Sequence, residues 1–170
     1  MQAGDDPALR VRAATPRDMA EMIPLVNAAF AIETFLEGTR TDEIRMAEMM
    51  GQGQFLVARN EAGRVVASVY FEKRGDRAYL GMLAVDPAYQ GKGVGRTMME
   101  AAEHQSRIEG CLYMDITVLS LRPELPPIYR KLGYTETGTE EFHPSQPLKS
   151  GVVCHSIVMS KALTSPEPAA

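Results

Sequence analysis

The sequence has two cysteines, three histidines and no tryptophan in 170 residues. Cys111 and Cys154 are too few and too far apart for a disulfide framework or a cysteine metal cluster. We interpret both as reduced thiols, which is typical of a cytosolic protein. His104, His143 and His155 are scattered without the spacing of metal ligands. The sequence therefore predicts no metal centre.

Long apolar runs and an excess of positive charge are missing as well. No run of about 18 apolar residues occurs, which excludes a membrane-spanning helix, and the acidic segment 1–7 does not resemble a signal peptide. The net charge of −4 argues against non-specific binding to nucleic acid. The length and the apolar fraction of 45% are those of one globular domain. We expect a single cytoplasmic domain over residues 1–163 and a disordered tail at 164–170.

Apolar periodicity predicts strands and helices along the whole chain. The expected strands are 9–13, 54–59, 65–72, 77–85, 112–119, 134–142 and 152–161. Helices are expected after Thr15 with a kink or a break at Pro24, after a Thr41 cap, after the loop that ends at Gly95, and before Gly133. The third of these helices would bury Ile108 on its apolar stripe.

The strand at 77–85 is apolar on both faces, which is typical of a central strand covered from two sides. Strict alternation would put Tyr79, Gly81, Leu83 and Val85 on one face and Leu80, Met82 and Ala84 on the other.

The most informative segment follows that strand. Pro87 fixes a turn, and a glycine-rich loop from Gln90 to Gly95 then opens a helix. Backbone amides at a helix start are unpaired and lie at the positive end of the helix dipole, so they bind phosphates. Glycines let an anion approach the backbone without a Cβ in the way. The segment predicts a phosphorylated ligand.

Two common phosphate-binding loops fit this segment badly. A dinucleotide-binding turn needs a third glycine where Arg96 stands, and a P-loop needs a serine or threonine where Gly93 stands. A nucleotide-binding domain is therefore disfavoured.

The run Gln90-Gly91-Lys92-Gly93-Val94-Gly95 resembles the Gln/Arg-x-x-Gly-x-Gly/Ala loop of the GNAT superfamily, the acetyl-CoA-dependent N-acetyltransferases. The resemblance includes residues 83–87 and 128–134 and is specific over 77–135. It implies an α/β (α+β) fold, with a mixed central sheet of about seven strands that splays between the fourth and fifth strands. About four helices would flank that sheet.

The resemblance also implies a site for acetyl-CoA as co-substrate. The pyrophosphate would bind at Gln90, Gly91, Lys92, Gly93, Val94, Gly95 and Arg96. The backbone of Leu83, Ala84 and Val85 would pair with the pantetheine arm, as in strand addition. An N–H near Leu83 would polarise the thioester carbonyl. Arg122 stands where the family usually has asparagine; it could reach a phosphate, or it is a solvated loop arginine.

Tyr129 matches the family tyrosine that protonates the departing CoA thiolate. Without the surrounding motif, a tyrosine that packs a short helix onto the sheet is the simpler interpretation, but the motif favours the functional role. A free tyrosine has a pKa of about 10 and a thiol about 8.5, so the proton transfer is uphill by roughly 2 kcal/mol. Tyr129 therefore needs a lowered pKa, or it acts mainly as a hydrogen-bond donor.

The general base is harder to identify. An alkylammonium with a pKa of about 10.4 leaves about one molecule in a thousand neutral near pH 7. The glutamate that many family members carry on the fourth strand is missing from residues 79–82. Glu33, Glu72 and Asp115 are the candidates. Glu33 ranks first because it lies where the family builds its acceptor site, and water is an alternative proton carrier.

The sequence thus predicts an N-acetyltransferase that moves an acetyl group from acetyl-CoA to a primary amine, by direct attack in a ternary complex without a metal. The alternative is a non-catalytic acyl-CoA-binding sensor or subunit with the same fold. The acceptor, a small molecule or a peptide amine, stays open. No nucleic acid or membrane partner is expected, and the resemblance implies a homodimer through the last strands.

Overall fold

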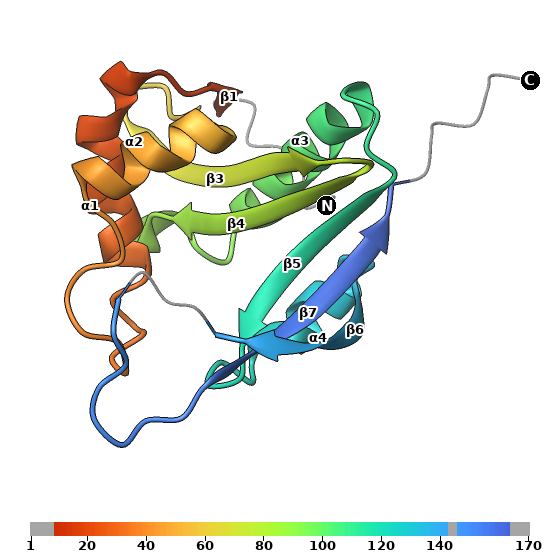
Figure 1. The fold of residues 1–170 in the computed structure, drawn as a ribbon. Helices are drawn as coiled ribbons and strands as arrows, with labels where there is room; N and C mark the ends of the chain where they lie inside the picture. The colour runs from red at the N-terminus through yellow and green to blue at the C-terminus, as the bar shows by residue number, and fades with distance from the viewer. Residues whose placement is uncertain (1–8, 143–145, 164–170) are drawn as a thin grey trace, which may run out of the picture.

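A seven-stranded mixed sheet forms the centre of the molecule in the computed structural model, which describes residues 9–142 and 146–163 (Figure 1). The strands follow the order β1-β2-β3-β4-β5-β7-β6 across the sheet. Their bounds are β1 Arg10–Ala13, β2 Gln54–Arg59, β3 Val65–Arg74, β4 Arg77–Val85, β5 Tyr113–Leu119, β6 Thr135–Glu141 and β7 His155–Ala162. The predicted sheet is confirmed.

Four α-helices and two short 3-10 helices accompany the sheet in the described part of the chain. Their bounds are η1 Pro16–Asp18, α1 Met19–Ala29, α2 Glu43–Gln52, η2 Pro87–Tyr89, α3 Val94–Ile108 and α4 Leu125–Lys131. None of the described helices is long and apolar enough to cross a membrane. The tail expected at 164–170 lies outside the described residues.

The sheet splays where its one parallel pair comes apart. β1 to β4 are antiparallel neighbours, as are β5, β7 and β6, and β4 and β5 are parallel. The β4–β5 register covers only Arg77–Leu80 against Tyr113–Ile116. Both strands continue beyond it and diverge in Figure 1. The expected split between the fourth and fifth strands is confirmed.

Apolar side chains of β4 enter two separate cores, as expected for a strand covered on both sides. One core packs against α3 and includes Leu80, and the other packs against α1 and α2 and includes Ala84. The predicted alternation is wrong after Gly81, because Leu83 and Val85 pack in the same core as Leu80. Met82 has a φ of 51°, and the pairing with β3 slips opposite this residue. Such a bulge inserts one residue and reverses the faces that follow.

Three local predictions for the helices need correction. The cap of α2 is Asp42, whose side chain accepts a hydrogen bond from the Arg45 amide at 2.9 Å, whereas Thr41 is buried one residue earlier. Pro24 lies inside a continuous α1, so the break that was one of the two expected effects is wrong. Ile108 is 65% exposed at the end of α3. Buried Glu103 belongs to the inner face instead, and an ion pair with Lys161 at 2.6 Å satisfies its charge.

Candidate active site

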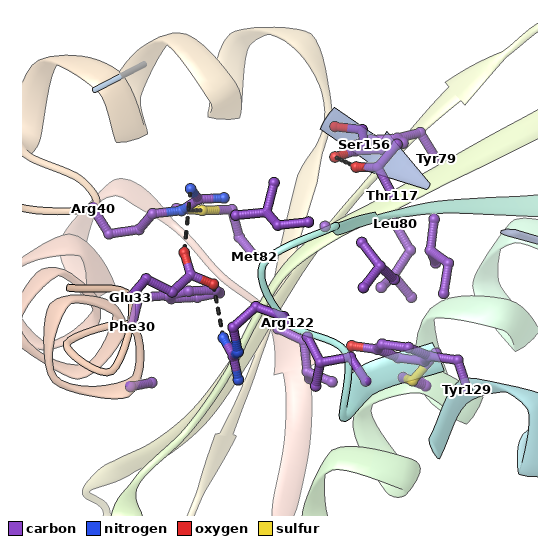
Figure 2. Close-up of a pocket in the computed structure, with 18 of the residues that line it drawn as sticks. Phe30, Glu33, Arg40, Tyr79, Leu80, Met82, Thr117, Arg122, Tyr129 and Ser156 are labelled. Atoms are coloured by element: carbon purple, nitrogen blue, oxygen red, sulfur yellow. Dashed lines mark hydrogen bonds and ion pairs between the residues drawn. The ribbon is translucent and has the colours of Figure 1, made fainter. Parts of the chain in front are cut away.

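A cavity of about 690 Å³ lies at the open end of the β4–β5 pair. β4, β5, the start of α3, α4 and the loops before α2 and α4 supply its walls. Side chains from segments far apart in sequence face one another across it (Figure 2). The predicted site residues that line it are Glu33, Leu83, Val85, Gln90, Gly95, Arg96, Arg122 and Tyr129. One cavity thus brings together most of the residues that the sequence singles out.

The glycine-rich loop presents a helix start to this cavity. Gly91 and Gly93 have φ of +77° and +79°, and Gly93 is the N-cap of α3. The first amides of an α-helix have no acceptor within the helix, so those of Val94, Gly95 and Arg96 are available to a ligand. A Cβ added at Gly95 would lie 3.8 Å from the nearest atoms of Leu83 and Val85, which is an ordinary contact.

The edge of β4 is the second wall. Beyond Leu80 the described structure gives β4 no strand partner on the β5 side, so its backbone there borders the cavity. Leu83 and Val85 line the cavity, whereas the side chain of Ala84 is buried in the opposite core. An extended ligand could pair with this edge as an added strand does.

Tyr129 of α4 lines the cavity and also packs. Its ring lies edge-on to Tyr134, with ring centroids 6.3 Å apart. Burial raises the pKa of Tyr129 above the usual value of 10; Arg122 opposes this shift and Glu33 adds to it. The lowered pKa considered from the sequence is therefore wrong for this structure. A neutral phenol that donates a hydrogen bond is the form that fits.

Glu33 lies in the cavity wall between two arginines (Figure 2). Its side chain is 5% exposed, and Arg122 Nη1 donates to Oε2 at 2.8 Å. Arg40 Nη1 is 3.9 Å from Oε1, too far for a hydrogen bond. In the described structure Oε1 is buried and accepts no hydrogen bond. The carboxylate thus has one satisfied oxygen and one unsatisfied oxygen beside the cavity.

Arg122 positions Glu33 and is not the solvated loop arginine considered from the sequence. Its side chain is 16% exposed, and its Nε donates to Glu124 at 2.5 Å while Nη1 binds Glu33. That alternative is wrong because two carboxylates, one of them buried, hold the guanidinium inside the wall. Contact with a CoA phosphate stays a prediction.

The other two base candidates are occupied by structural partners and do not line the cavity. Glu72 accepts hydrogen bonds from Tyr70 and Arg74. Asp115 accepts two from Arg77, at 2.6 and 2.7 Å, and one from Ser160 at 2.5 Å. The hydrogen bond from Arg77 is the main reason why the pKa of Asp115 is lowered.

Sequence reasoning missed Arg40 and a group of hydroxyls at the start of the splay. Tyr79 Oη and Thr117 Oγ1 are 3.4 Å apart, and both line the cavity together with Ser156 (Figure 2). A Cβ on Gly81 would come within 2.9 Å of Tyr79 Oη, so the ring needs this glycine. The spacing Tyr79-x-Gly81 was the available signal, because residues two apart in a strand share a face.

Neither the thiols nor the histidines suggest a metal. Cys111 and Cys154 are free. Residues 9–142 and 146–163 contain no group of three or more histidine, cysteine or acidic side chains that could hold an ion. His143 lies outside the described residues.

Comparison with known proteins gives a consistent result. The model of the GNAT acetyltransferase domain matches residues 51–136. A mycothiol acetyltransferase of Propionibacterium freudenreichii subsp. shermanii is 29% identical over 141 residues, a match that covers 78% of this chain and 45% of that protein. The chain thus spans less than half the length of this curated relative.

Solved structures share the fold at low sequence identity. The ribosomal-protein-S18-alanine N-acetyltransferase of Escherichia coli has a TM-score of 0.73 at 18% identity, covering 95% of this chain and 99% of that one. yncA of Salmonella typhimurium, solved with its cofactor acetyl-CoA, has a TM-score of 0.72 at 21% identity, covering 95% and 97%. These likenesses support the GNAT architecture of the chain.

Proposed function

Since the chain belongs to the GNAT family of acetyltransferases, we propose that it transfers an acetyl group from acetyl-CoA to a primary amine within a ternary complex. One observation carries the proposal. A single cavity combines an unpaired strand edge, an open helix start and a neutral phenol. The free thiols support a reducing compartment, and we place the protein in the cytoplasm.

Acetyl-CoA would bind along two walls of this cavity. The pyrophosphate lies against the amides of the loop and the first turn of α3, from Gln90 to Arg96. The pantetheine arm pairs with the backbone of β4 at Leu83, Ala84 and Val85. This arrangement directs the thioester toward the splay, where an amide near Leu83 donates to the carbonyl oxygen. Arg122 is close enough to the cavity to serve as an additional cation.

The transfer itself needs two proton movements. The amine nitrogen attacks the thioester carbonyl carbon, and the resulting oxyanion accepts a hydrogen bond from the β4 backbone. As the intermediate collapses, the carbon–sulfur bond breaks and Tyr129 donates its hydroxyl proton, fully or as a hydrogen bond, to the thiolate. The attacking nitrogen loses a proton to Glu33, directly or through one water. The products are an acetamide and CoA.

Glu33 is suited to the amine side because it lines the cavity and its buried Oε1 accepts no hydrogen bond from the described residues. A carboxylate at this place attracts an ammonium group and accepts its proton or passes it to water. Arg122 keeps the other oxygen occupied and so fixes the side-chain orientation.

Calorimetry and a thiol-release assay test the proposal together. We expect acetyl-CoA to bind, and Gly95→Asp to weaken binding at least tenfold, about 1.4 kcal/mol, because its carboxylate repels the pyrophosphate. Gly95→Ala is the matched control, since its Cβ has room, and it should bind within twofold of the parent. Gly93→Val is a poorer test because the φ of +79° strains any β-branched residue.

Turnover separates the proposed enzyme from a binding protein. We expect a panel of primary amines to include acceptors that release CoA thiol at a rate dependent on amine concentration. Tight acetyl-CoA binding without any amine-dependent release would identify a sensor or subunit. Equal affinity in Gly95→Asp would place the cofactor elsewhere.

A further inference from the structure

Arg40 is a charged residue of the cavity, next to Glu33, that the proposed transfer leaves without a role. It lies in the loop between α1 and α2, where its guanidinium carbon is 4.8 Å from the centroid of the Phe30 ring. Its Nε contacts Met82 Sδ at 3.3 Å. These two contacts hold the guanidinium plane in the cavity wall, with the side chain 23% exposed (Figure 2).

The pairing of Arg40 with Glu33 is incomplete on both sides. The 3.9 Å separation of Nη1 and Oε1 leaves an ion pair without a hydrogen bond. Within the described part of the chain, Glu33 Oε1 accepts no hydrogen bond and the two terminal nitrogens of Arg40 donate none to protein. Buried charges are stable when hydrogen-bonded partners surround them. The two terminal nitrogens of Arg40 and the Oε1 of Glu33 thus lie side by side, and none of them has a hydrogen bond to the described protein.

The two arginines of this wall share one buried carboxylate. Two guanidinium groups, Arg40 and Arg122, flank the single buried carboxylate of Glu33. Glu124 compensates Arg122 from the solvent side. A second cavity of about 290 Å³, also lined by Glu33 and Arg40, adds the cation of Lys149. The part of the wall around Arg40 therefore favours an anion.

We infer that the acceptor is an amine with an anionic group beside it, as in a free amino acid, and that Arg40 selects it. This inference rests on the proposed function. In the complex the acceptor carboxylate takes two hydrogen bonds from Arg40, and its ammonium donates to Glu33 Oε1. Arg40 and Glu33 each exchange one opposite partner for another, so neither charge is left unpaired.

A plain amine lacks this exchange. To reach Glu33 Oε1 it must displace Arg40 and leave a guanidinium in the wall without an anion. Such an uncompensated charge penalises the wrong ligand and produces specificity. The same reasoning disfavours the N-terminal amine of a polypeptide, because its neighbouring carboxyl group is part of a peptide bond and carries no charge.

The test uses the protein saturated with CoA, titrated in a calorimeter at pH 7 with the twenty amino acids and with the primary amines that lack their carboxylates. We expect at least one amino acid to bind at least tenfold more tightly than its matched amine. Arg40→Gln should lower the affinity for that amino acid at least tenfold and the affinity for the matched amine less than twofold. Arg40→Lys keeps the charge but loses the planar fork, so it should bind with intermediate affinity.

Arg45→Gln is the control, because Arg45 already forms an ion pair with Asp42 and donates a hydrogen bond to the Thr39 carbonyl. This variant should still bind the amino acid more tightly than the matched amine. Thermal unfolding checks that each variant is folded. If Arg40→Gln does not fold, the comparison is made with Arg40→Lys. Equal affinity for amino acids and amines, equal weakening of both by Arg40→Gln, or no amino acid binding would overturn the inference. Amino acid binding that depends on Arg40 without thiol release from acetyl-CoA would instead overturn the proposed function; Arg40 would then select a bound amino acid that is not an acetyl acceptor.

Discussion

The two ends of the β4–β5 pair each carry an arginine–carboxylate pair, and the pairs differ in completeness. At the closed end, where the strands are hydrogen-bonded, both oxygens of Asp115 accept hydrogen bonds from Arg77, and Ser160 adds a third. At the open end, Glu33 has one oxygen bound to Arg122 and one that accepts no hydrogen bond in the described structure.

The difference separates a structural carboxylate from one that is available to a ligand. A carboxylate whose oxygens already accept hydrogen bonds from the protein needs no ligand to satisfy them. Asp115 of β5 is such a group, and its hydrogen bonds from Arg77 of β4 and Ser160 of β7 link the three strands. A buried oxygen without a donor is costly unless something else fills it. We therefore expect changes at the open end to alter catalysis and changes at the closed end to alter stability.

The largest effect on the open end should come from Tyr129→Phe. The hydroxyl matters most when charge develops on the leaving thiolate, so we expect kcat to fall about a hundredfold while the KM for acetyl-CoA changes little. Since burial raises the pKa of Tyr129, the phenol stays neutral between pH 6 and 9, and the loss should be uniform across that range. Steady-state kinetics over these pH values measure it.

Tyr134→Phe is the matched control, because it removes a buried hydroxyl from the adjacent ring. Its turnover should stay within about twofold of the parent, an allowance in keeping with the small effects of groups away from the reacting atoms. If Tyr129→Phe instead retains the parental rate from pH 6 to 9, Tyr129 is a packing residue.

Glu33→Gln should produce the next largest effect. The glutamine keeps the size of the side chain but loses its charge and basicity, so we expect kcat/KM for the amine to fall about tenfold, about 1.4 kcal/mol, the scale of one charged hydrogen bond. The loss should be greatest at low pH, where neutral amine is scarcest, and an acceptor of lower pKa should recover part of it. Acetyl-CoA affinity, measured by calorimetry, should be unchanged.

Glu124→Gln provides the control for this variant, since it removes the other carboxylate on the same guanidinium from the exposed side. Acetylation should stay close to the parent. A similar loss in both variants would mean that Glu33 acts only by holding Arg122, and that the unfilled oxygen has no direct part.

The two walls of the cavity also differ in how well they could be predicted from the sequence. The wall that we propose for acetyl-CoA could be predicted because it depends on backbone conformation. Gly91 and Gly93 adopt the left-handed conformations that favour glycine, the strand before them is continuous, and the helix starts next to them. All of these features lie within one local stretch of chain.

On the side proposed for the acceptor, Glu33 could be predicted, but the role of Arg40 and the pairing of Glu33 with Arg122 could not, because they depend on contacts between separate segments. Arg122 meets Glu33 and Arg40 only after folding, and charged side chains in two loops look alike in a sequence. The bulge at Met82 was equally invisible, since the apolar pattern of β4 permits either face. That bulge decides that Leu83 shares the core of Leu80 and also places Met82 against Arg40.

The smallest effect should come from the closed end, with Asp115→Asn. The variant loses the ion pair with Arg77 and weakens the hydrogen bond from Ser160. Because Arg77 and Asp115 are 41% and 25% exposed, we expect a loss of only about 1 kcal/mol in the free energy of unfolding. Urea unfolding at pH 7 measures it, and acetylation by the folded variant should match the parent.

The pH dependence of that loss sharpens the comparison. The folded structure lowers the pKa of Asp115 below its usual value of 3.8, so the unfolded chain takes up this proton at a higher pH than the folded protein does. The stabilisation is therefore complete above about pH 5 and is lost as the pH falls through the lower, folded pKa. The stability gap between parent and Asp115→Asn should be constant from pH 7 to 5 and narrow below about pH 4, in urea titrations at each pH. A tenfold loss of acetylation in Asp115→Asn with little change in unfolding would reverse the roles assigned to the two ends, because the fully paired carboxylate would then be the one that serves the reaction.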